Sequence, residues 1–305
     1  MADSSVGDAI LRRRRLTNRD KVSCPYTSPM TAIPRYAVFG HPVAHSLSPR
    51  LHALFAEQTG IAVEYTAIDA VPDEFEHAVR EFFARGGRGA NVTLPHKAAA
   101  FALADVHTPV AQRLGVANVL VVLPDGRIEA GSNDGAGMLV DMRARFGVDP
   151  HEREVLLLGA GGAARATAFA LLDARARHLT IANRTPARAQ ALAAALSEPE
   201  RVRTVEWAAL DRCAAFDLII NATSAGVQHA ALVLPRSLVQ THTFAYDLSY
   251  GPAARAFVEW ALAAGCAVAD GLGMLVETAA ASFERWHGVR PDTEAALCAI
   301  RDTPL

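Results

Sequence analysis

The sequence predicts an α/β fold with mostly parallel strands, and two observations support this prediction. Short apolar strands alternate with helical patterns along most of the chain of 305 residues. A glycine-rich turn at 159–164 separates a buried strand from a helix. Such alternation is typical of a layered fold in which helices cover a parallel sheet. The length, with 51% apolar residues, allows about two domains with sizeable cores.

The strands of the first half are short apolar runs, each leading into a helix: "RYAVFG", "VEYTAI" and "GANVTL". The first helix lies in "AHSLSPRLHALF", residues 44–55, where we expect Ser48 to be the N-cap and Pro49 the first helical residue. The second helix should begin near Pro72. Asp125-Gly126 then marks the turn of a hairpin between "ANVLVVLP" and "RIEAG".

The second half shows the same alternation after a helix through Met138 and Met142. Periodicity places its strands at Val155–Leu158, His178–Ala182, Arg203–Glu206, Asp217–Asn221 and Phe244–Leu248. The region 271–302 is helical again. Its pattern does not decide which half of the chain it packs on.

Composition and charge exclude several classes of function. The formal charge of -2 and the pI of 6.6 offer no broad basic surface for nucleic acid, and no apolar run approaches the roughly 20 residues of a membrane span. Cys24, Cys213, Cys266 and Cys298 are widely scattered, so we expect reduced thiols in a cytoplasmic protein and no metal site. Residues 1–30, with "LRRRR" at 11–15, are expected to be a disordered extension.

The run "LLLGAGGAARA" predicts a Rossmann-type dinucleotide-binding domain. It fits G-x-G-x-x-A between a buried strand and a helix. Gly159 permits a tight turn, Gly161 lets the backbone approach a pyrophosphate, and Ala164 allows the helix to pack closely. Small residues also serve ordinary turns, but the strand-loop-helix context favours a cofactor site.

The end of the next strand, "IANRTPAR", favours NADP over NAD. An NAD site usually has a carboxylate here, which accepts a hydrogen bond from the ribose 2′-hydroxyl. This chain has Asn183 instead, followed by Arg184 and Arg188, whose charges suit a 2′-phosphate. The alternative is that both arginines are solvated surface residues and that Thr185 simply caps the next helix.

A second group of polar residues follows the strand "GANVTL". Asn91, Thr93 and Lys97 lie at its end and at the start of the next helix, where an open α/β sheet binds its ligands. A lysine there can donate a proton or a hydrogen bond to a carbonyl oxygen, and Asp134 in "SNDGAG" is the nearest candidate to hold it in place. Taken singly, Lys97 is explained as a surface residue and Asp134 as a helix cap.

Together these motifs resemble the shikimate dehydrogenase family from Tyr36 to about Pro291. The matching segments are "VFGHPVAHSLSP", "GANVTLPHK", "GVANVL", "NDGAG", "GAGGAARA", "NRTPAR", "NATSAGV", "DLSYGP" and "DGLGMLVETAAASFERWHG". The resemblance implies an N-terminal open α/β substrate domain, 31–134 with 271–305, and a Rossmann-type NADP domain, 135–270, with a cleft between them. It implies a monomer or homodimer that acts on a small ring carboxylate.

The resemblance also implies roles for individual residues. Lys97 with Asp134 would transfer the proton, Ser46 and Ser48 would bind the substrate carboxylate, and "NATSAG", 221–226, would lie beside the cofactor. The expected substrate-binding residues are Ser46, Ser48, Asn91, Thr93, Asn118, Tyr250 and Thr278. The expected cofactor-binding residues are Gly159, Ala160, Gly161, Gly162, Ala163, Asn183, Arg184, Thr185, Arg188, Asn221, Ala222, Thr223, Ser224, Gly273 and Met274.

Several positions depart from the family pattern. Thr278 stands where the family usually has a substrate-binding glutamine, and Asn133 where it has a threonine before the aspartate. Val119 and Arg255 also replace customary threonines. The expected activity is the NADP-dependent interconversion of 3-dehydroshikimate and shikimate. The alternatives are a paralogue that uses quinate or another ring carboxylate, and a dinucleotide-binding sensor without turnover.

Overall fold

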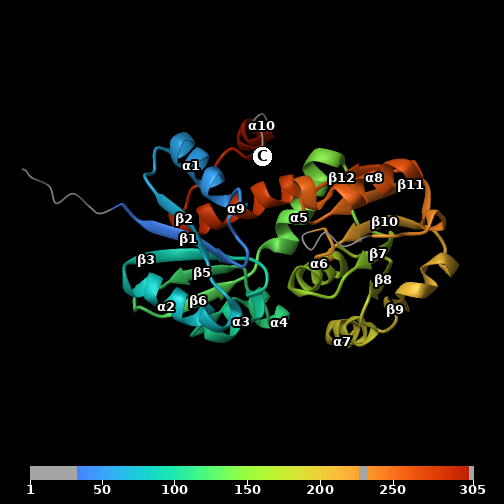
Figure 1. Ribbon diagram of the computed structural model, residues 1–305, viewed down its shortest axis with the longest axis horizontal. Coiled ribbons are helices and arrows are strands. Elements are labelled where there is room, and N and C mark those ends of the chain that lie inside the picture. The colour runs from blue at the N-terminus through green and yellow to red at the C-terminus, as the bar shows by residue number, and fades with distance from the viewer. Residues whose placement is uncertain (1–32, 227–231, 302–305) are drawn as a thin grey trace, which may run out of the picture. The chain divides into compact units, whose positions relative to one another are not determined.

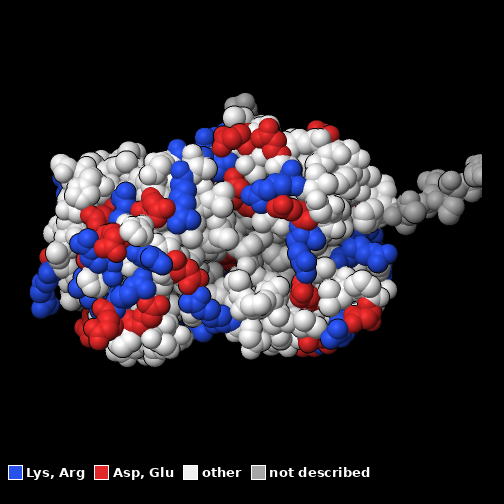
Figure 2. Space-filling view, turned by 180° about the vertical axis from the view of Figure 1, so that it is seen from behind, with Lys and Arg blue, Asp and Glu red and all other residues white. Residues whose placement is uncertain are grey.

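The computed structural model describes residues 33–226 and 232–301, which form two six-stranded sheets with helices on their faces (Figure 1). The sequence predictions for residues 1–30 and for Cys24 lie outside the described residues. In the described part, Cys213, Cys266 and Cys298 are free thiols, and no helix there is long and apolar enough to cross a membrane. On the face that Figure 2 shows, acidic and basic side chains are interspersed.

The first sheet has the strand order β2-β1-β3-β5-β6-β4. Its strands are β1 (Arg35–Gly40), β2 (Glu64–Asp69), β3 (Gly87–Val92), β4 (Val106–His107), β5 (Val119–Val122) and β6 (Ile128–Gly131). β1 pairs in parallel with β2 and β3, whereas β5 is antiparallel to β3 and β6. The predicted hairpin is therefore confirmed. The two-residue β4 was not predicted, because it is too short to produce an alternating pattern.

The second sheet is entirely parallel, with the order β12-β11-β10-β7-β8-β9. Its strands are β7 (Glu154–Leu158), β8 (His178–Asn183), β9 (Val202–Glu206), β10 (Phe216–Asn221), β11 (Val239–Asp247) and β12 (Ala267–Ala269). Chain order reverses between β7 and β10, which creates the crevice where such sheets bind ligands. β12 was not predicted from the sequence, because an edge strand of only three residues leaves no clear pattern.

The helices occupy the expected intervals between strands, and ten of them are α-helical in the described residues. They are α1 (Ser48–Thr59), α2 (Phe75–Ala84), α3 (Lys97–Leu103), α4 (Pro109–Leu114), α5 (Asp134–Phe146), α6 (Gly162–Asp173), α7 (Pro186–Leu196), α8 (Arg255–Ala264), α9 (Leu272–His287) and α10 (Thr293–Arg301). A short 3₁₀ turn, Pro72–Glu74, precedes α2.

Strand β7 shows why the second sheet forms from unbroken apolar runs. Val155 and Leu157 pack with α5, α6 and α7 on one face of the sheet, and Leu156 and Leu158 pack with α8 on the other. All four side chains are fully buried. A strand covered on both faces needs apolar residues at every position rather than at alternate ones.

Helices α1 and α9 pack together on the first sheet. Leu51 and Phe55 of α1 are buried against Val276 and Phe283 of α9, and Trp286 of α9 stacks on Tyr36 of β1 with ring centres 4.6 Å apart. The same helix α9 also packs along α5. Thus α9 contacts both the first sheet and the helix that leads into the second, a placement that periodicity did not decide.

The start of α1 corrects the predicted cap. Leu47 holds the cap position, and Ser48 is already helical. The Oγ atom of Ser46 accepts a 3.3 Å hydrogen bond from the backbone N–H of Ser48, whereas the Ser48 hydroxyl donates to Tyr65. The prediction that Ser48 caps the helix is wrong, because Leu47 holds the cap position and no side chain makes a capping hydrogen bond there. Ser48 is 6% exposed.

Candidate active site

A cavity of about 450 Å³ lies at the carboxyl ends of strands from both sheets. Most of the residues predicted to bind a ligand line it. From the first sheet and α9 these are Ser46, Ser48, Thr93, Lys97, Asp134, Met274 and Thr278; from the second sheet they are 159–163, Asn183, Arg184, Thr185, Arg188, 222–224 and Tyr250. The structure therefore brings both sequence-predicted groups to one place.

Four predicted site residues do not line this cavity: Asn91, Asn118, Asn221 and Gly273. Conversely, His41 and His45, in the stretch after β1, line the cavity but were not predicted as site residues. Nδ1 of His41 hydrogen-bonds Asp69 over 2.6 Å. This bond and the backbone N–H of Val43 hold the pKa of the Asp69 carboxyl below its usual range. The histidines in "FGHPVAH" were the signal that was available.

Lys97 and Asp134 are the first residues of α3 and α5, and they meet at the cavity wall. Nζ of Lys97 donates to Oδ2 of Asp134 over 2.5 Å, and their side chains are 12% and 9% exposed. Neither single-residue alternative holds: Lys97 is not a surface residue, and Asn133 rather than Asp134 occupies the cap position of α5. A lysine held in this way can donate a proton to an oxygen in the cavity.

Asn118 and Asn91 lie behind this pair. Nδ2 of Asn118 donates to Oδ1 of Asp134 and to Oδ1 of Asn133, each over 2.7 Å. Asn91 accepts from the hydroxyl of Tyr65 over 2.8 Å and donates to Oγ of Ser282, also over 2.8 Å. Both asparagines therefore bond to protein groups instead of facing the cavity.

The N-terminal end of α1 brings Ser46 and Ser48 to the same cavity. The free N–H groups and partial positive charge of a helix N-terminus favour a carboxylate there. Tyr250 comes near the same segment, since it hydrogen-bonds the backbone of Leu47. Burial raises the pKa of the Tyr250 phenol, so this group remains a neutral hydrogen-bond donor.

The glycine-rich turn after β7 has the backbone that a dinucleotide needs. Gly159 has φ +111°, and a Cβ atom there would lie 2.7 Å from the carbonyl oxygen of Ala222. Gly161 is the cap residue of α6, and nothing lies within 4 Å of the position its Cβ would take. The open backbone at Gly161 and the start of a 12-residue helix fit a pyrophosphate.

The residues after β8 also fit a phosphorylated ribose. Arg184 and Arg188 are exposed, and neither forms an ion pair with another described residue. Nδ2 of Asn183 donates to the carbonyl of Thr185 and so shapes the turn. Thr185 is at the cap position of α7, but its side chain makes no capping hydrogen bond.

Asn221 and Gly273 do not line the cavity themselves, but each precedes a residue that does, Ala222 and Met274 respectively. Nδ2 of Asn221 donates to Asp247 over 2.8 Å, and its Oδ1 accepts from Thr223. Burial raises the pKa of Asp247 to about 7. The carboxylate of Asp141 fills the space where a side chain at position 273 would lie, so glycine allows α9 and α5 to approach closely.

Thr278 faces the cavity from α9, at the position where the sequence leaves its family pattern. Its hydroxyl donates to the carbonyl oxygen of Leu275 over 3.0 Å. The side chain is therefore held against its own helix, and it does not extend into the cavity as a glutamine would.

Comparison with known proteins agrees with this geometry. Residues 38–120 match the family model of the shikimate dehydrogenase substrate-binding domain, 142–243 that of shikimate/quinate 5-dehydrogenase, and 271–300 that of the shikimate 5′-dehydrogenase C-terminal domain. A shikimate dehydrogenase (NADP(+)) of Xanthomonas campestris pv. campestris is 53% identical over 272 residues, covering 88% of this chain and 96% of the relative.

Two further relatives extend this similarity. A shikimate dehydrogenase (NADP(+)) of Stenotrophomonas maltophilia is 51% identical over 269 residues, which are 88% of this chain and 95% of the relative. The crystal structure of shikimate 5-dehydrogenase from Thermus thermophilus, in complex with NADP(H) and shikimate, superimposes with a TM-score of 0.78 at 37% identity. That match covers 88% of this chain and 99% of the other.

Proposed function

This chain belongs to the shikimate dehydrogenase family, and we propose that it catalyses the NADP-dependent, reversible reduction of 3-dehydroshikimate to shikimate. One observation carries the proposal: the Lys97–Asp134 pair, closed to 2.5 Å, lines the same cavity as the dinucleotide-type turn after β7. A proton donor and a site for a hydride donor thus lie at one cavity, which is what the reduction of a ketone requires.

The chain's own residues supply the proton and the orientation. Bound NADPH supplies the hydride that is added to the carbonyl carbon. Lys97 donates a hydrogen bond to the carbonyl oxygen and transfers a proton to it, so that ketone, hydride and proton together give the alcohol. Asp134 keeps the ammonium directed at this oxygen. In the reverse direction the amine of Lys97 takes up the hydroxyl proton.

The remaining cavity residues bind the two ligands. Ser46 and Ser48 donate to the substrate carboxylate at the start of α1, and Thr93 holds a ring hydroxyl. The segment 159–163 binds the pyrophosphate, and Arg184 with Arg188 binds the 2′-phosphate. The substrate domain comprises 31–134 and 271–305, and the NADP domain comprises 135–270. We also propose a cytoplasmic protein that is a monomer or a homodimer.

Exchange of Lys97 tests the proposed function directly. Lys97→Ala should abolish turnover of shikimate, while NADP binding, measured by titration of intrinsic fluorescence, stays nearly unchanged. Lys97→Arg is the matched control, because it keeps a positive charge beside Asp134 but gives up its proton far less readily. Full activity of Lys97→Ala would remove the lysine from the mechanism. A wild-type protein that binds NADP but oxidises neither shikimate nor quinate would be a sensor.

The departure from the family pattern at Thr278 supports quinate as an alternative substrate. The short side chain, bonded to the Leu275 carbonyl, leaves space that a glutamine would fill, which suits a ring with an added substituent such as quinate. Thr278→Gln should lower KM for shikimate by about five- to tenfold, the value of one hydrogen bond. Thr278→Val, which keeps the size, is the control. An unchanged preference between shikimate and quinate in Thr278→Gln would show that this position does not select the substrate.

A further inference from the structure

The carboxylate of Asp134 is held from behind by a chain of amide and hydroxyl groups. Nδ2 of Asn118 uses one hydrogen for Oδ1 of Asp134 and the other for Oδ1 of Asn133. Oδ1 of Asn118 accepts from the backbone N–H of Asn133 over 2.9 Å. Both amide hydrogens of Asn118 are thus already engaged, and donation to a ligand would require breaking one of these bonds.

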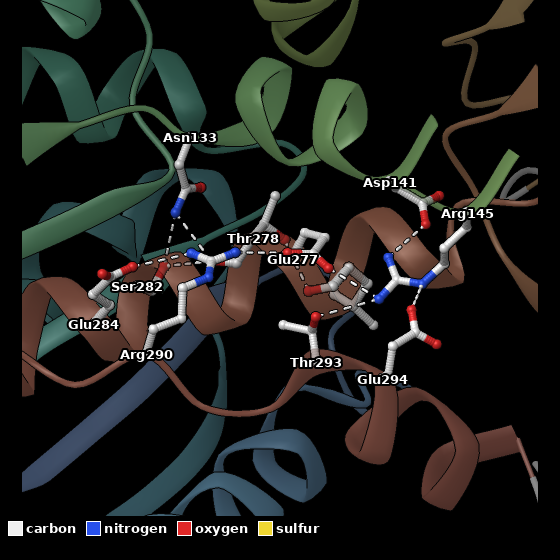
Figure 3. A network of polar contacts seen from close by, with 11 residues as sticks. Asn133, Asp141, Arg145, Glu277, Thr278, Ser282, Glu284, Arg290, Thr293 and Glu294 are labelled. Carbon is white, nitrogen blue, oxygen red and sulfur yellow. Dashed lines mark hydrogen bonds and ion pairs between the residues drawn. The ribbon is translucent and has the colours of Figure 1, made fainter. Parts of the chain in front are cut away.

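Asn133 is anchored in turn on α9. Its Nδ2 donates to the carbonyl oxygen of Thr278 over 3.0 Å and to Oγ of Ser282 over 3.1 Å. Figure 3 shows this amide directed at the helix from above, with Thr278 and Ser282 below it. All the polar atoms of the Asn133 side chain therefore have partners. A threonine, the family's usual residue at this position, has a single donor hydrogen and could not make both of these donations.

Ser282 is the branch point of the chain. Its hydroxyl donates to the Thr278 carbonyl over 3.0 Å and accepts from two amides, that of Asn133 and, over 2.8 Å, that of Asn91. The side chain is fully buried and does not line the cavity. Asn91 continues the chain to Tyr65, which the hydroxyl of the cavity-lining Ser48 contacts.

We propose that Asn118, Asn133 and Ser282 are positioning residues, which act through Asp134 to aim Lys97 at the reacting oxygen. The inference rests on the proposed function. Every donor in the chain has one acceptor, so the Asp134 carboxylate can rotate only if buried hydrogen bonds break, and a buried, fully satisfied network resists such a change.

Steady-state kinetics of Ser282→Ala and Asn133→Ala test this role. Each variant should lower kcat by about tenfold, since a small displacement of a catalytic group is enough for such a loss, while KM for shikimate stays within about twofold. Ser282→Thr, which keeps the hydroxyl, should restore most of kcat. Thr180→Ala is the matched control. It removes a buried hydroxyl from β8 that accepts from Arg203 over 2.8 Å, and it should leave kcat unchanged.

Three results would overturn the inference. Unchanged kcat in both Ser282→Ala and Asn133→Ala would show that the chain serves only stability, and a rise in KM alone would place Asn133 in contact with substrate. Crystal structures of the two variants test the positioning role without a measurement of turnover. An Asp134 carboxylate rotated away from Lys97 supports the role, and an unchanged Asp134–Lys97 contact refutes it. A wild-type protein inactive on both shikimate and quinate would instead refute the proposed function.

Discussion

Replacing Arg145 with methionine should lower the free energy of unfolding by about 3 kcal/mol. Arg145 lies on α5 and makes hydrogen-bonded ion pairs with two buried carboxylates (Figure 3). Nη1 donates to Asp141 over 2.8 Å, and Nη2 donates to Glu277 of α9 over 2.9 Å. Asp141 is fully buried and Glu277 is 3% exposed. Without Arg145, the buried carboxylates of Asp141 and Glu277 would lose the positive charge that they share.

The contacts that remain set the size of the effect. Removal of one partner of a buried ion pair typically costs about 3–5 kcal/mol. Here Glu277 keeps its ion pair with Arg290 over 2.6 Å, and Asp141 keeps the hydroxyl of Tyr246 over 2.5 Å, so the low end of the range applies. The third pair of Arg145, with the 65% exposed Glu294, adds little because water screens it.

Chemical denaturation at about pH 7 measures the loss, and thermal unfolding should show a midpoint lowered by about 6–12 °C. Arg143→Met is the control on the same helix. Arg143 pairs with Asp149 over 2.8 Å, but the two side chains are 46% and 50% exposed, so its loss should cost about 1 kcal/mol or less.

The penalty should also depend on pH. Burial already raises the pKa of Asp141, and loss of its cation raises it further. In Arg145→Met this carboxyl takes up a proton in the folded state at a higher pH than in the unfolded chain, so lowering the pH toward about 5 should bring the variant closer to wild type. A loss below about 1 kcal/mol, or an equal loss in Arg143→Met, would refute the reasoning.

Three further predictions concern the two ligand sites and the core. Arg184→Ala combined with Arg188→Ala should weaken NADP far more than NAD in binding titrations; equal weakening would show that the arginines do not discriminate the cofactors. Ser46→Ala should raise KM for the substrate carboxylate with little change in melting temperature, and an unchanged KM would limit Ser46 to its hydrogen bond with Ser48. Burial lowers the pKa of His52 in the folded protein from 6.5 to about 3. Between these two pH values His52 is protonated in the unfolded chain but not in the folded protein. The free energy of unfolding therefore falls as the pH drops below about 6.5. Urea denaturation should show that His52→Phe loses about 2 kcal/mol less of its free energy of unfolding than the wild type does between pH 7 and about 5. An unaltered pH dependence in this variant would contradict the argument.

The sequence by itself determined the α/β class, all the strands except the short β4 and β12, and the two ligand-binding motifs. These features have local signatures. Unbroken apolar runs such as that of β7 appear wherever a strand is covered on both faces, and the turn at Gly159 needs a positive φ that favours glycine. Lys97 and Asp134 were also found from local context, because each opens a helix after a strand end.

Only the tertiary structure decided how the site is supported. Asn133 and Ser282 are 149 positions apart and Arg145 and Glu277 are 132 apart, and no periodicity links residues at such distances. At α1 the pattern suggested Ser48 as the cap, but packing turned its hydroxyl toward Tyr65 and left Ser46 to accept the N–H. The apolar pattern of α9 likewise suited either half of the chain. Local patterns report which residues are buried, whereas the partner of a buried polar group depends on which elements come together in space.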